Sequence, residues 1–521
     1  MKTMITFTYA ICLLCIMQGV WARRNRGFTS RREKNQNILI IGGGIGGVTT
    51  AKFLEEKGYN DITLIERDEA IGGMCKSLKY DDYPDVYEMG AVLISPVYSY
   101  INDFIDEYSL NTLERPSVTL VDPLNGDVED WESEDLKFDF LSSSELKKLE
   151  REVIKYGRLL LKYRHIAEPG LRNLDRRLCV PFYEWAEKND IRYLQRVFLS
   201  FVTLYGYGYL GNEESDQIPL PYVMKYFGLR EMVSVAISLS NPRSRNVNPS
   251  EELVEFLKEA RKGSDCDGAE CQLLYRIENV GFQGLVKAIA NSLQHTKIIT
   301  SANITAIDRT PNSVTAQWEK GGKVFSHEYR KMIIAFHQTK KNLESINMGL
   351  TRAEESLFSK VRTRNYFTLT APLSCFDDDD GVYEMILKPG SALQHPKITL
   401  SPKDAFPSQI AVPGNKQSNG KAMSVIYVYS IEQISLDEVK QNVISYFKNL
   451  CNETLDTEDF RDAISWDYFA HVDADELANR FYDKIHRLQG RRNTYWTGSL
   501  MNFELTERTI AYSHQLVKDF F

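Results

Sequence analysis

The chain has 521 residues, of which 43% are hydrophobic and 26% are charged, and its formal net charge is −8. A chain of this length and apolar content can bury a large core, and at roughly 100–200 residues per domain it predicts two to four domains. Because the net charge is negative and basic residues are not interleaved with aromatic ones, the composition argues against a nucleic-acid-binding protein.

The amino-terminal residues 1–22 are predicted to be a signal peptide. Lys2 supplies a positive start, residues 4–20 carry no charge, and small residues within 20–22 flank a cleavage point. The apolar run is shorter than the roughly 20 residues of a membrane span and contains polar side chains. We therefore expect a protein that is secreted or kept in the secretory lumen, with no stable membrane span. The basic leader 23–35 is expected to be solvated chain, with peripheral contact to an anionic membrane surface as the weaker alternative.

A dinucleotide-binding half-domain is predicted between Asn37 and Cys75. The apolar run Ile38–Ile41 is typical of a parallel strand buried on both faces, and it leads into a glycine-rich turn and a helix over 48–57. A second strand, Ile62–Ile65, ends at an acidic residue. Strand, glycines, helix, strand and acidic residue in this order favour a Rossmann-like site over a simple glycine-rich turn.

Each glycine of the motif has a separate role in the predicted site. Gly42 allows the tight turn, Gly44 lets the backbone approach a pyrophosphate, and Gly47 permits close packing of helix on strand. The first amides of the helix face the phosphates. Glu66 is expected to bind the adenosine ribose, where an NADP site would prefer Arg. The residues expected to contact the cofactor here are Gly42, Gly44, Ile45, Gly46, Gly47, Glu66 and Arg67.

A second glycine pair, Gly72 and Gly73, follows the ribose acid. This arrangement resembles the FAD-binding amine oxidase superfamily, in which the loop also touches the cofactor, and it therefore implies FAD rather than NAD. The superfamily usually has Arg or Lys after the pair, whereas this chain has Met74, so the phosphate is expected to lose one cationic contact. Gly90 and Ala91 are expected at the same cofactor.

Helical periodicity predicts a cap over three later segments, 144–162, 181–205 and 222–237. The polar segment Asn241–Glu270 is expected to be an exposed insert. Strands between 297 and 336 are expected to return to the dinucleotide fold, and the stretch 367–429 alternates strands with loops.

The expected fold class is α/β, with a Rossmann-like FAD-binding domain, an inserted helical cap and a mixed-sheet substrate domain, as in amine oxidases. In chain order, the expected parts are the signal peptide 1–22, the leader 23–35, FAD-binding segment 36–114, the cap 115–271 with insert 241–270, FAD-binding segment 272–340, a mixed β substrate domain 341–464 and FAD-binding segment 465–521.

Six cysteines follow the signal peptide. Cys266 and Cys271 lie in a hydrophilic segment and are the best candidates for a local disulfide, although the sequence does not fix the connectivity. The candidates for buried thiols are Cys75, Cys179, Cys375 and Cys451. Asn303 and Asn452 begin glycosylation sequons, which have meaning only in a secreted chain. The acidic run Asp377–Asp380 is expected to be a solvated loop rather than a metal site.

The last sixty residues are predicted to close the cofactor domain. Gly498 completes an aromatic-x-Gly motif, which in the superfamily lies against the ribityl chain together with the next polar residue. Ser499 stands where the superfamily usually has Asp or Glu, so one ribityl hydrogen bond is expected to be absent. A helix beginning near Thr506 is expected to point its amino terminus at the flavin phosphates or ring.

Several longer motifs resemble a narrower group, the FAD-containing polyunsaturated (polyenoic) fatty acid isomerases, over most of residues 36–521. The motifs are Tyr87-Glu88-Met89-Gly90-Ala91, Tyr205-Gly206-Tyr207-Gly208, Tyr222-Val223-Met224-Lys225-Tyr226, Gln489-Gly490-Arg491-Arg492-Asn493-Thr494 and the helix His514–Phe521. The resemblance implies an isomerase that turns methylene-interrupted polyunsaturated fatty acids into conjugated dienes or trienes. Hydride would pass from the substrate to flavin N5 and return at another carbon, with no net redox change.

The resemblance also implies roles for particular side chains. Tyr205 and Tyr207 would line a substrate tunnel and stabilise a transient carbocation through cation–π attraction, with core packing as the alternative. Arg115 is the candidate for binding the fatty-acid carboxylate, and Lys225 is the weaker candidate.

Motifs of other enzyme classes are missing: after the predicted signal peptide, the sequence has no GxSxG, HExxH or CxxC, which argues against a hydrolase and against a metal site. Two alternatives to the isomerase are kept. One is a secreted flavin amine or L-amino-acid oxidase that releases H2O2, and the other is a non-catalytic protein that only holds FAD.

Overall fold

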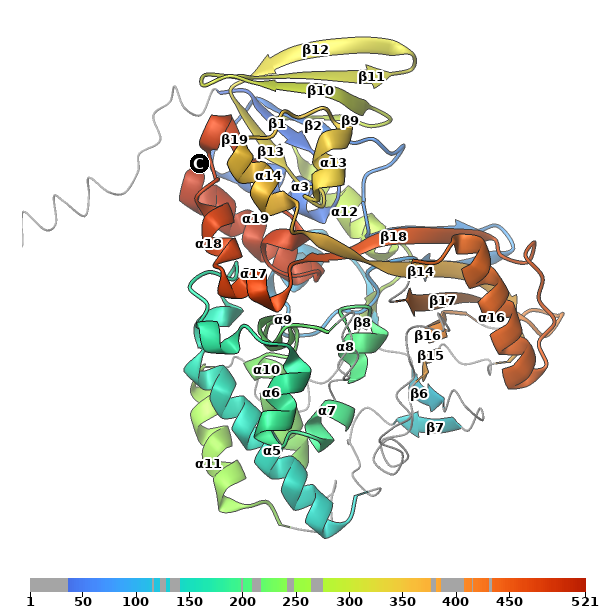
Figure 1. The fold of residues 1–521 in the computed structure, drawn as a ribbon. Coiled ribbons are helices and arrows are strands. Elements are labelled where there is room, and N and C mark those ends of the chain that lie inside the picture. Colours follow the sequence, from blue (N-terminus) through green and yellow to red (C-terminus); the bar gives the residue numbers. More distant parts are fainter. Residues whose placement is uncertain are drawn as a thin grey trace, which may run out of the picture.

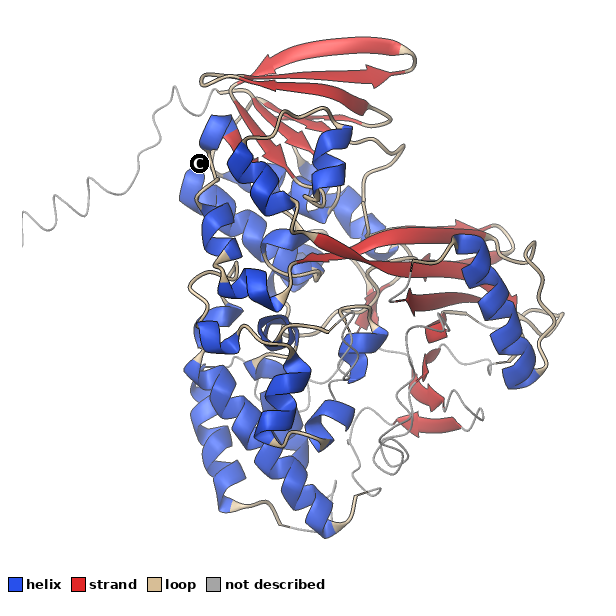
Figure 2. Cartoon of the chain, in the orientation of Figure 1, coloured by secondary structure: helices blue, strands red, loops and turns tan. Residues whose placement is uncertain are grey.

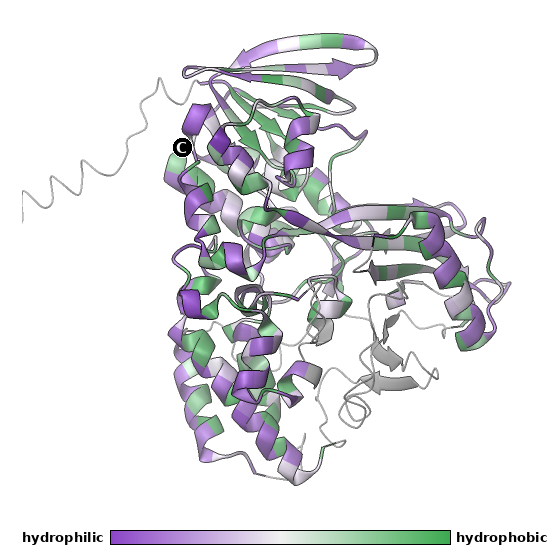
Figure 3. Cartoon of the chain, in the orientation of Figure 1, coloured by the Kyte–Doolittle hydropathy of each residue, from purple (hydrophilic) through white to green (hydrophobic). Residues whose placement is uncertain are grey.

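In the computed structural model, the strand predicted at Ile38–Ile41 is the centre of a five-stranded parallel sheet. This strand, β1, is almost completely buried and pairs with β2 on one side and β13 on the other. The strand order is β19-β13-β1-β2-β9, so the sheet draws on three separate stretches of the chain (Figure 1). The other four strands are β2 (Ile62–Ile65), β9 (Thr296–Ile299), β13 (Lys331–Ile334) and β19 (Thr494–Trp496). Figure 3 colours these strands mainly as hydrophobic, as expected for strands covered on both faces.

The structure describes residues 36–114, 117–121, 128–131, 141–197, 200–208, 217–240, 248–263, 275–375, 381–385, 407–414, 416–430 and 433–521. The predicted signal peptide and leader, Arg115, Cys266, Cys271 and the run Asp377–Asp380 lie outside the described residues.

Three helices accompany the parallel sheet: α3 (Ile45–Glu56), α12 (Gly281–Ser292) and α19 (Thr506–Phe520). Helix α3 packs on β1 and β2, and both α12 and α19 pack on α3. The hydroxyl of Ser513 on α19 donates to the carbonyl of Gly46 at 3.1 Å, which joins segments 467 residues apart. Helix α3 begins earlier than the predicted residue 48, because Gly46 and Gly47 are part of its first turn.

The stretch predicted to alternate strands with loops contributes to a seven-stranded sheet with the order β18-β14-β17-β16-β15-β6-β7. Its strands are β6 (Ser117–Val121), β7 (Val128–Trp131), β14 (Arg362–Leu373), β15 (Gly381–Met385), β16 (Pro407–Val412), β17 (Ala422–Ser430) and β18 (Asp462–His471). Neighbouring strands are antiparallel except β6 and β15, which run parallel. Figure 2 shows helix α16 (Leu436–Cys451) lying against this sheet.

Strand β17 divides its side chains between two cores. Ile426 and Val428 pack in the core beneath α16, whereas Val425, Tyr427 and Tyr429 belong to the core on the opposite face. This alternation is the period of two that a β-strand imposes. The second face, which is rich in tyrosine, is the one that packs against the helical and cofactor parts.

The helical cap contains α5 (Ser143–Lys162), α6 (Phe182–Asn189), α7 (Tyr193–Val197), α8 (Ser200–Leu204), α9 (Leu220–Tyr226), α10 (Leu229–Ser240) and α11 (Glu251–Ala260). Helices α5, α10 and α11 pack together, and a capping box between Ser142 and Glu145 starts α5. Both later segments predicted as continuous helices are interrupted, the last of them at Phe227 and Gly228.

Two parts of the sequence-based organisation differ from the structure. Helix α11 falls inside the expected exposed insert, but Leu253, Phe256 and Leu257 are buried against α5 and α10. The spacing of these residues is helical, and Ser250 caps the helix by accepting from the amide of Leu253, so the surrounding polar composition concealed a real amphipathic helix. In addition, the range expected to be a helical cap begins with β6 and β7, which join the seven-stranded sheet.

Two further features were not anticipated. The strands β10 (Asn303–Arg309), β11 (Val314–Lys320) and β12 (Lys323–Tyr329) form a separate antiparallel sheet rather than entering the parallel one. Cys375 and Cys451 form a disulfide between the segment after β14 and the end of α16, with Cα atoms 5.9 Å apart. These two cysteines are therefore not buried thiols, whereas Cys75 and Cys179 are.

Candidate active site

The turn between β1 and α3 forms an open cradle of backbone amides. Gly44 is the N-cap of α3, no side chain caps the helix, and its first turn carries no acidic residue. A Cβ on Gly47 would lie 1.9 Å from the carbonyl oxygen of Gly42, so only glycine allows this contact between helix and strand. A Cβ on Gly44 would meet nothing closer than 3.7 Å, so its outer side is accessible. Uncapped amides at a helix amino terminus are a site for phosphate.

The second glycine pair lies directly on this cradle. The amide of Gly72 donates to the carbonyl of Gly43 at 3.0 Å, and a Cβ on Gly73 would come within 3.0 Å of the Cα of Gly44. Both glycines of the pair have positive φ, +142° and +56°. The two glycine signatures, separated in the sequence, therefore form one continuous backbone surface.

Met74 connects this surface to the segment that carries Gly90 and Ala91. Its carbonyl accepts from the amide of Ala91 at 3.4 Å, and a Cβ on Gly90 would lie 1.8 Å from the same oxygen. The structure thus brings together the predicted cofactor residues Gly72, Gly73, Met74, Gly90 and Ala91. Contact of these residues with a cofactor stays a prediction.

Glu66 ends β2 beside the cradle. Its side chain is 7% exposed, and its carboxylate accepts from the amide of Gly43 at 2.5 Å and from the amide of Asp68 at 2.8 Å. The predicted ribose acid is therefore held in place against the glycine turn. Arg67 was predicted with it, but its side chain is 79% exposed and lies beside Asp68, so the structure does not bring it into the cradle.

The carboxyl ends of β13 and β19 complete the other side of the cradle. Gly498, with φ +101°, approaches the first turn of α3, since a Cβ on Gly46 would lie 3.4 Å from its Cα. Gln338 is fully buried and donates to the carbonyl of Thr497 at 2.7 Å, while its Oε1 has no hydrogen-bond partner among the described atoms. An unpaired buried acceptor beside Gly498 fits a ligand that brings a hydroxyl group.

His337, which the sequence reading did not single out, follows β13 at this edge. Its Nε2 lies 2.9 Å from the hydroxyl of Ser499 and 3.1 Å from the carboxylate of Glu504. Burial lowers the pKa of His337, but the Glu504 carboxylate and Asp467 together more than offset this, so the pKa is raised above its ordinary value. The available signal was its position just after a buried parallel strand, where ligands of α/β sheets are bound.

The strand order gives the direction in which a dinucleotide would lie. Glu66 follows β2, the glycine turn follows β1, and His337 and Ser499 follow β13 and β19 on the far side. An adenosine ribose at Glu66 and phosphates at Gly44 therefore place the second half of the dinucleotide near Ser499. The open amides, the close glycine contacts and the unpaired oxygen of Gln338 fit such a group.

An aromatic cluster adjoins this far side. Tyr207 is 4% exposed, and its hydroxyl donates to the carbonyl of Glu504 at 3.3 Å. The rings around it, with centroid distances, are Phe503 (4.9 Å), Tyr226 (5.0 Å), Phe469 (5.5 Å) and Tyr468 (5.7 Å). Tyr205 is only partly buried and lies at the edge of the cluster, with its ring 6.5 Å from that of Tyr226. We call Tyr207, Tyr226, Tyr468, Phe469 and Phe503 the aromatic cluster.

The glycines around Tyr207 explain the motif Tyr205-Gly206-Tyr207-Gly208. Gly206 has φ +74°, and a Cβ there would lie 2.6 Å from the ring of Tyr366. Gly208 has φ +131°, and a Cβ there would lie 2.9 Å from the guanidinium of Arg364. Both positions thus need glycine for conformation and for space. The motif holds Tyr207 between two closely packed walls.

Lys225 does not have the position of a carboxylate-binding residue. It is completely buried, and its ammonium donates to the carbonyls of Ile166 at 2.8 Å and Glu168 at 2.5 Å. Burial lowers the pKa of Lys225 well below its ordinary value. The side chain ties α9 to the turn 164–170 of the cap, and this geometry argues against the predicted contact with substrate. Arg115, the other candidate, lies outside the described residues.

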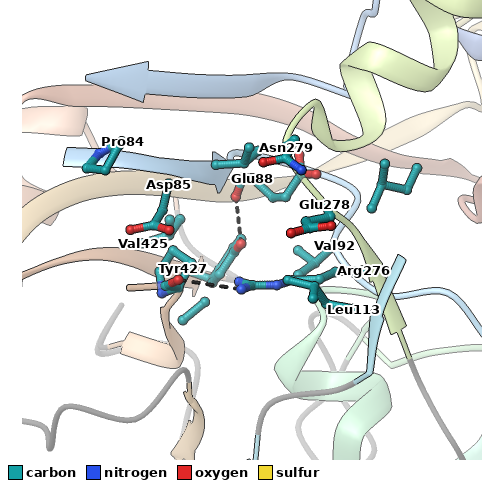
Figure 4. A pocket seen from close by; sticks show the side chains of 14 residues that line it. Pro84, Asp85, Glu88, Val92, Leu113, Arg276, Glu278, Asn279, Val425 and Tyr427 are labelled. Atoms are coloured by element: carbon teal, nitrogen blue, oxygen red, sulfur yellow. Dashed lines mark hydrogen bonds between the residues drawn. The ribbon is translucent and has the colours of Figure 1, made fainter. Parts of the chain in front are cut away.

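A pocket of about 120 Å³ lies between β4 (Tyr83–Glu88), β8 (Tyr275–Ile277) and the β16–β17 edge (Figure 4). Inside it, the hydroxyl of Tyr427 donates to the carbonyl of Glu88 at 2.6 Å. The Glu88 carboxylate accepts from Ser77 at 2.6 Å and from the amide of Phe282, in the first turn of α12, at 2.7 Å. Burial raises the pKa of Glu88 to about 8. Glu88 thus anchors the segment that leads to Gly90 and Ala91.

Within the described part of the chain, no group of three or more His, Cys, Asp or Glu side chains is placed to hold a metal ion. Nor does any described helix combine the length and apolar character required to cross a bilayer.

The sequence profile of the flavin containing amine oxidoreductases matches residues 45–502. Among solved structures, the chain is similar to the CLA-producing fatty acid isomerase from P. acnes, with 21% identity, 94% of this chain and 99% of that chain covered, and a TM-score of 0.71. It is also similar to cyclohexylamine oxidase from Brevibacterium oxydans, with 13% identity, 93% and 98% covered, and a TM-score of 0.57. These likenesses confirm the predicted fold class.

A curated relative, tryptophan 2-monooxygenase of Agrobacterium vitis, is 33% identical over 91 residues. The match covers 17% of this chain and 12% of that protein, so the chain spans only a small part of the relative's length.

Proposed function

The chain belongs to the flavin containing amine oxidoreductases and is a flavin-dependent enzyme with FAD as its cofactor, and we propose that it isomerises polyunsaturated fatty acids. In this reaction, a hydride leaves a bis-allylic carbon of a methylene-interrupted diene and returns at another carbon of the same molecule. The product is a conjugated diene or triene. The observation that carries the proposal is the aromatic cluster around Tyr207, which adjoins the flavin side of the cofactor cradle through Glu504.

Bound FAD supplies a reversible hydride acceptor, so the reaction requires neither O2 nor a second cofactor. The protein's own contribution is then to orient the diene, exclude water and stabilise positive charge on the substrate. Aromatic faces do this through their quadrupoles, and the effect is larger when water is absent. The cluster provides such faces, with Tyr207, Phe469 and Phe503 buried and Tyr226 and Tyr468 partly buried.

The ionisation of the cluster favours hydride transfer over proton transfer. Burial raises the pKa of Tyr207 and Tyr468, and of Tyr222 beside the cluster, above the ordinary value of tyrosine. A phenol with a raised pKa stays protonated near neutral pH and is a poor general base. The hydroxyl of Tyr207 is, in addition, already donated to the backbone of Glu504. The cluster is therefore suited to contact an apolar chain through its ring faces.

The alternative function is that of an amine or L-amino-acid oxidase, which would have the same fold and the same cofactor. Family membership favours it, because the profile that matches the chain is that of amine oxidoreductases. The two functions differ in what happens to the hydride. An oxidase passes the electrons to O2 and releases H2O2, whereas the isomerase returns the hydride to its substrate.

The test uses the purified holoprotein under strict anaerobiosis. Linoleate, arachidonate and eicosapentaenoate are added separately, and the ultraviolet absorbance of conjugated dienes and trienes is followed. We expect conjugated product without O2 consumption. Peroxide release with amines or L-amino acids, together with no anaerobic diene formation, would instead establish the oxidase. A flavin absorbance spectrum that changes with neither unsaturated lipids nor amines would favour a non-catalytic protein that only holds FAD.

We also propose that the protein acts in the secretory lumen or outside the cell. The disulfide between Cys375 and Cys451 supports this location, because such bonds persist in oxidising compartments. Asn452, which begins a sequon, is exposed at the end of α16. Expression of the full chain in a secreting eukaryotic cell tests the proposal. We expect to recover the protein from the medium and to see its apparent mass decrease after treatment with an endoglycosidase. Retention of unglycosylated protein in the cytosol would contradict it.

A further inference from the structure

Among the described residues, the cofactor cradle presents few positive charges to a group that carries two phosphates. The loop that approaches Gly44 continues into Met74, which is uncharged. Arg67, near the opposite end of the cradle, points into solvent. Helix amides contribute partial charge only, and a formal cation close to the phosphates would add a stronger, charge-assisted interaction.

His337 lies where such a cation would act. It follows β13, and the preceding backbone at Ala335 runs within 3.1 Å of where a Cβ of Gly42 would be. On its other side is Ser499, in the loop that follows β19 and approaches the first turn of α3. The imidazole therefore stands at the shared carboxyl edge of β1, β13 and β19. Ligands of open α/β sheets are bound at this edge.

The groups that face His337 favour its charged form. Glu504 contributes a carboxylate from the segment before α19, and Asp467 on β18 contributes both its charge and a backbone hydrogen bond. Ser499 contributes a neutral hydroxyl from the third direction. Together these contacts raise the pKa of His337, although burial alone would lower it.

Charge on the imidazole fixes the direction of the Ser499 hydroxyl. The Nε2–H of an imidazolium is a donor that Glu504 at 3.1 Å and the Ser499 oxygen at 2.9 Å share, so the Ser499 hydroxyl cannot donate to it. The hydroxyl hydrogen is then directed away from His337 and is available to a group in the cradle. Loss of a proton removes the positive charge, and when the remaining proton lies on Nδ1 it removes this constraint as well.

We propose that His337, as an imidazolium held by Glu504, is a positioning residue for FAD: it supplies the positive charge missing at Met74 and turns the Ser499 hydroxyl toward the flavin-side phosphate. The proposal concerns retention of the cofactor and is independent of which reaction the bound flavin performs. It makes FAD affinity depend on pH through a residue outside the glycine motifs.

The test measures release of FAD from the holoprotein, by the rise in flavin fluorescence after dilution, at pH values between 6 and 9. We expect wild-type protein to lose affinity as the pH rises and His337 is deprotonated. His337→Gln should bind FAD about tenfold to a hundredfold more weakly at pH 6 and should show little dependence on pH. His327→Gln is the matched control, because His327 lies exposed on β12, and it should behave as wild type.

Two further variants separate a role at the cofactor from a role in folding. Ser499→Ala keeps the His337–Glu504 pair and should weaken FAD binding. The double variant Ser499→Ala/His337→Gln should bind FAD only slightly more weakly than His337→Gln alone. Met74→Arg in the His337→Gln background should restore FAD retention, since it returns a cation to the phosphates. Wild-type FAD release and pH dependence in His337→Gln would overturn the proposal. So would weak binding that Met74→Arg fails to rescue, because it would indicate damage to the fold.

Discussion

Replacement of Tyr207 tests the aromatic cluster most directly. Tyr207→Leu removes a ring that contacts four others, two of them at centroid distances of 4.9 and 5.0 Å. Each of the four aromatic pairs is worth about 0.5–1.5 kcal/mol beyond simple burial, so we expect a loss of about 2–6 kcal/mol in the free energy of unfolding. If the ring also faces the reacting diene, the loss of a desolvated cation–π contact of about 2 kcal/mol lowers kcat roughly thirtyfold.

Tyr207→Phe separates the ring from its hydroxyl. The Phe variant keeps the π face and loses the hydroxyl's hydrogen bonds, to Glu504 at 3.3 Å and to Tyr468. One such bond is worth about 1 kcal/mol, so turnover should stay within about fivefold of wild type. Tyr205→Leu is the matched comparison, since Tyr205 lies at the edge of the cluster, and it should have a smaller effect than Tyr207→Leu.

The assay is anaerobic diene formation, with flavin content and urea unfolding measured on the same samples. Equal turnover in Tyr207→Leu and wild type would refute the role of the ring in catalysis. A Phe variant as slow as the Leu variant would show that the hydroxyl matters, and proton transfer would then replace hydride transfer as the mechanism.

Three other changes have defined outcomes. Glu66→Arg or Gly44→Val should yield colourless protein, because one places a cation at the ribose and the other a side chain at the phosphates; retained yellow colour would contradict the cradle. Glu88→Gln should reduce the pH dependence of the free energy of unfolding. The carboxyl pKa of Glu88 rises from 4.5 to about 8 on folding, so the stabilising contribution of this group is complete below pH 4.5 and is lost as the pH rises toward 8. The loss amounts to at most about 1.4 kcal/mol for each pH unit. Urea unfolding at pH 5 and pH 8 measures this difference. Replacing Cys375 and Cys451 together by Ala should lower the free energy of unfolding by about 2–4 kcal/mol, since the disulfide closes a loop with a sequence separation of 76; unchanged urea midpoints would argue against a disulfide in solution.

The parts of the site that depend on local sequence could be predicted. The apolar run of β1, the glycines and Glu66 lie within one supersecondary unit, and each has a conformational or steric requirement that its residue type reveals. The placement of Gly42 and Gly47 against each other follows from the same logic. Even there, the predicted start of α3 was three residues too late, because glycines near the start of a helix are also typical of a turn.

The parts that depend on distant partners could not be predicted. Glu504, 167 residues away, raises the pKa of His337, and nothing in the sequence around either residue indicates the pairing. By residue type alone, Lys225 is a candidate for binding a carboxylate, but in the structure its ammonium donates to the carbonyls of Ile166 and Glu168. The amphipathic pattern of α11 was visible but was outweighed by its polar neighbours. In each case, tertiary packing decided a role that residue type left open.

The strands of the parallel sheet come from distant parts of the chain, and this determines when the cofactor cradle is complete during synthesis. Strand β19 and helix α19 lie more than 400 residues after the glycine turn, yet they form one wall of the cradle. A nascent chain that has completed β1, α3 and β2 therefore still has an unfinished sheet edge beside β13. Contacts of such high sequence separation form late and leave earlier segments exposed to aggregation. The wall of the cradle at Ser499 is accordingly complete only after nearly the whole chain has been made.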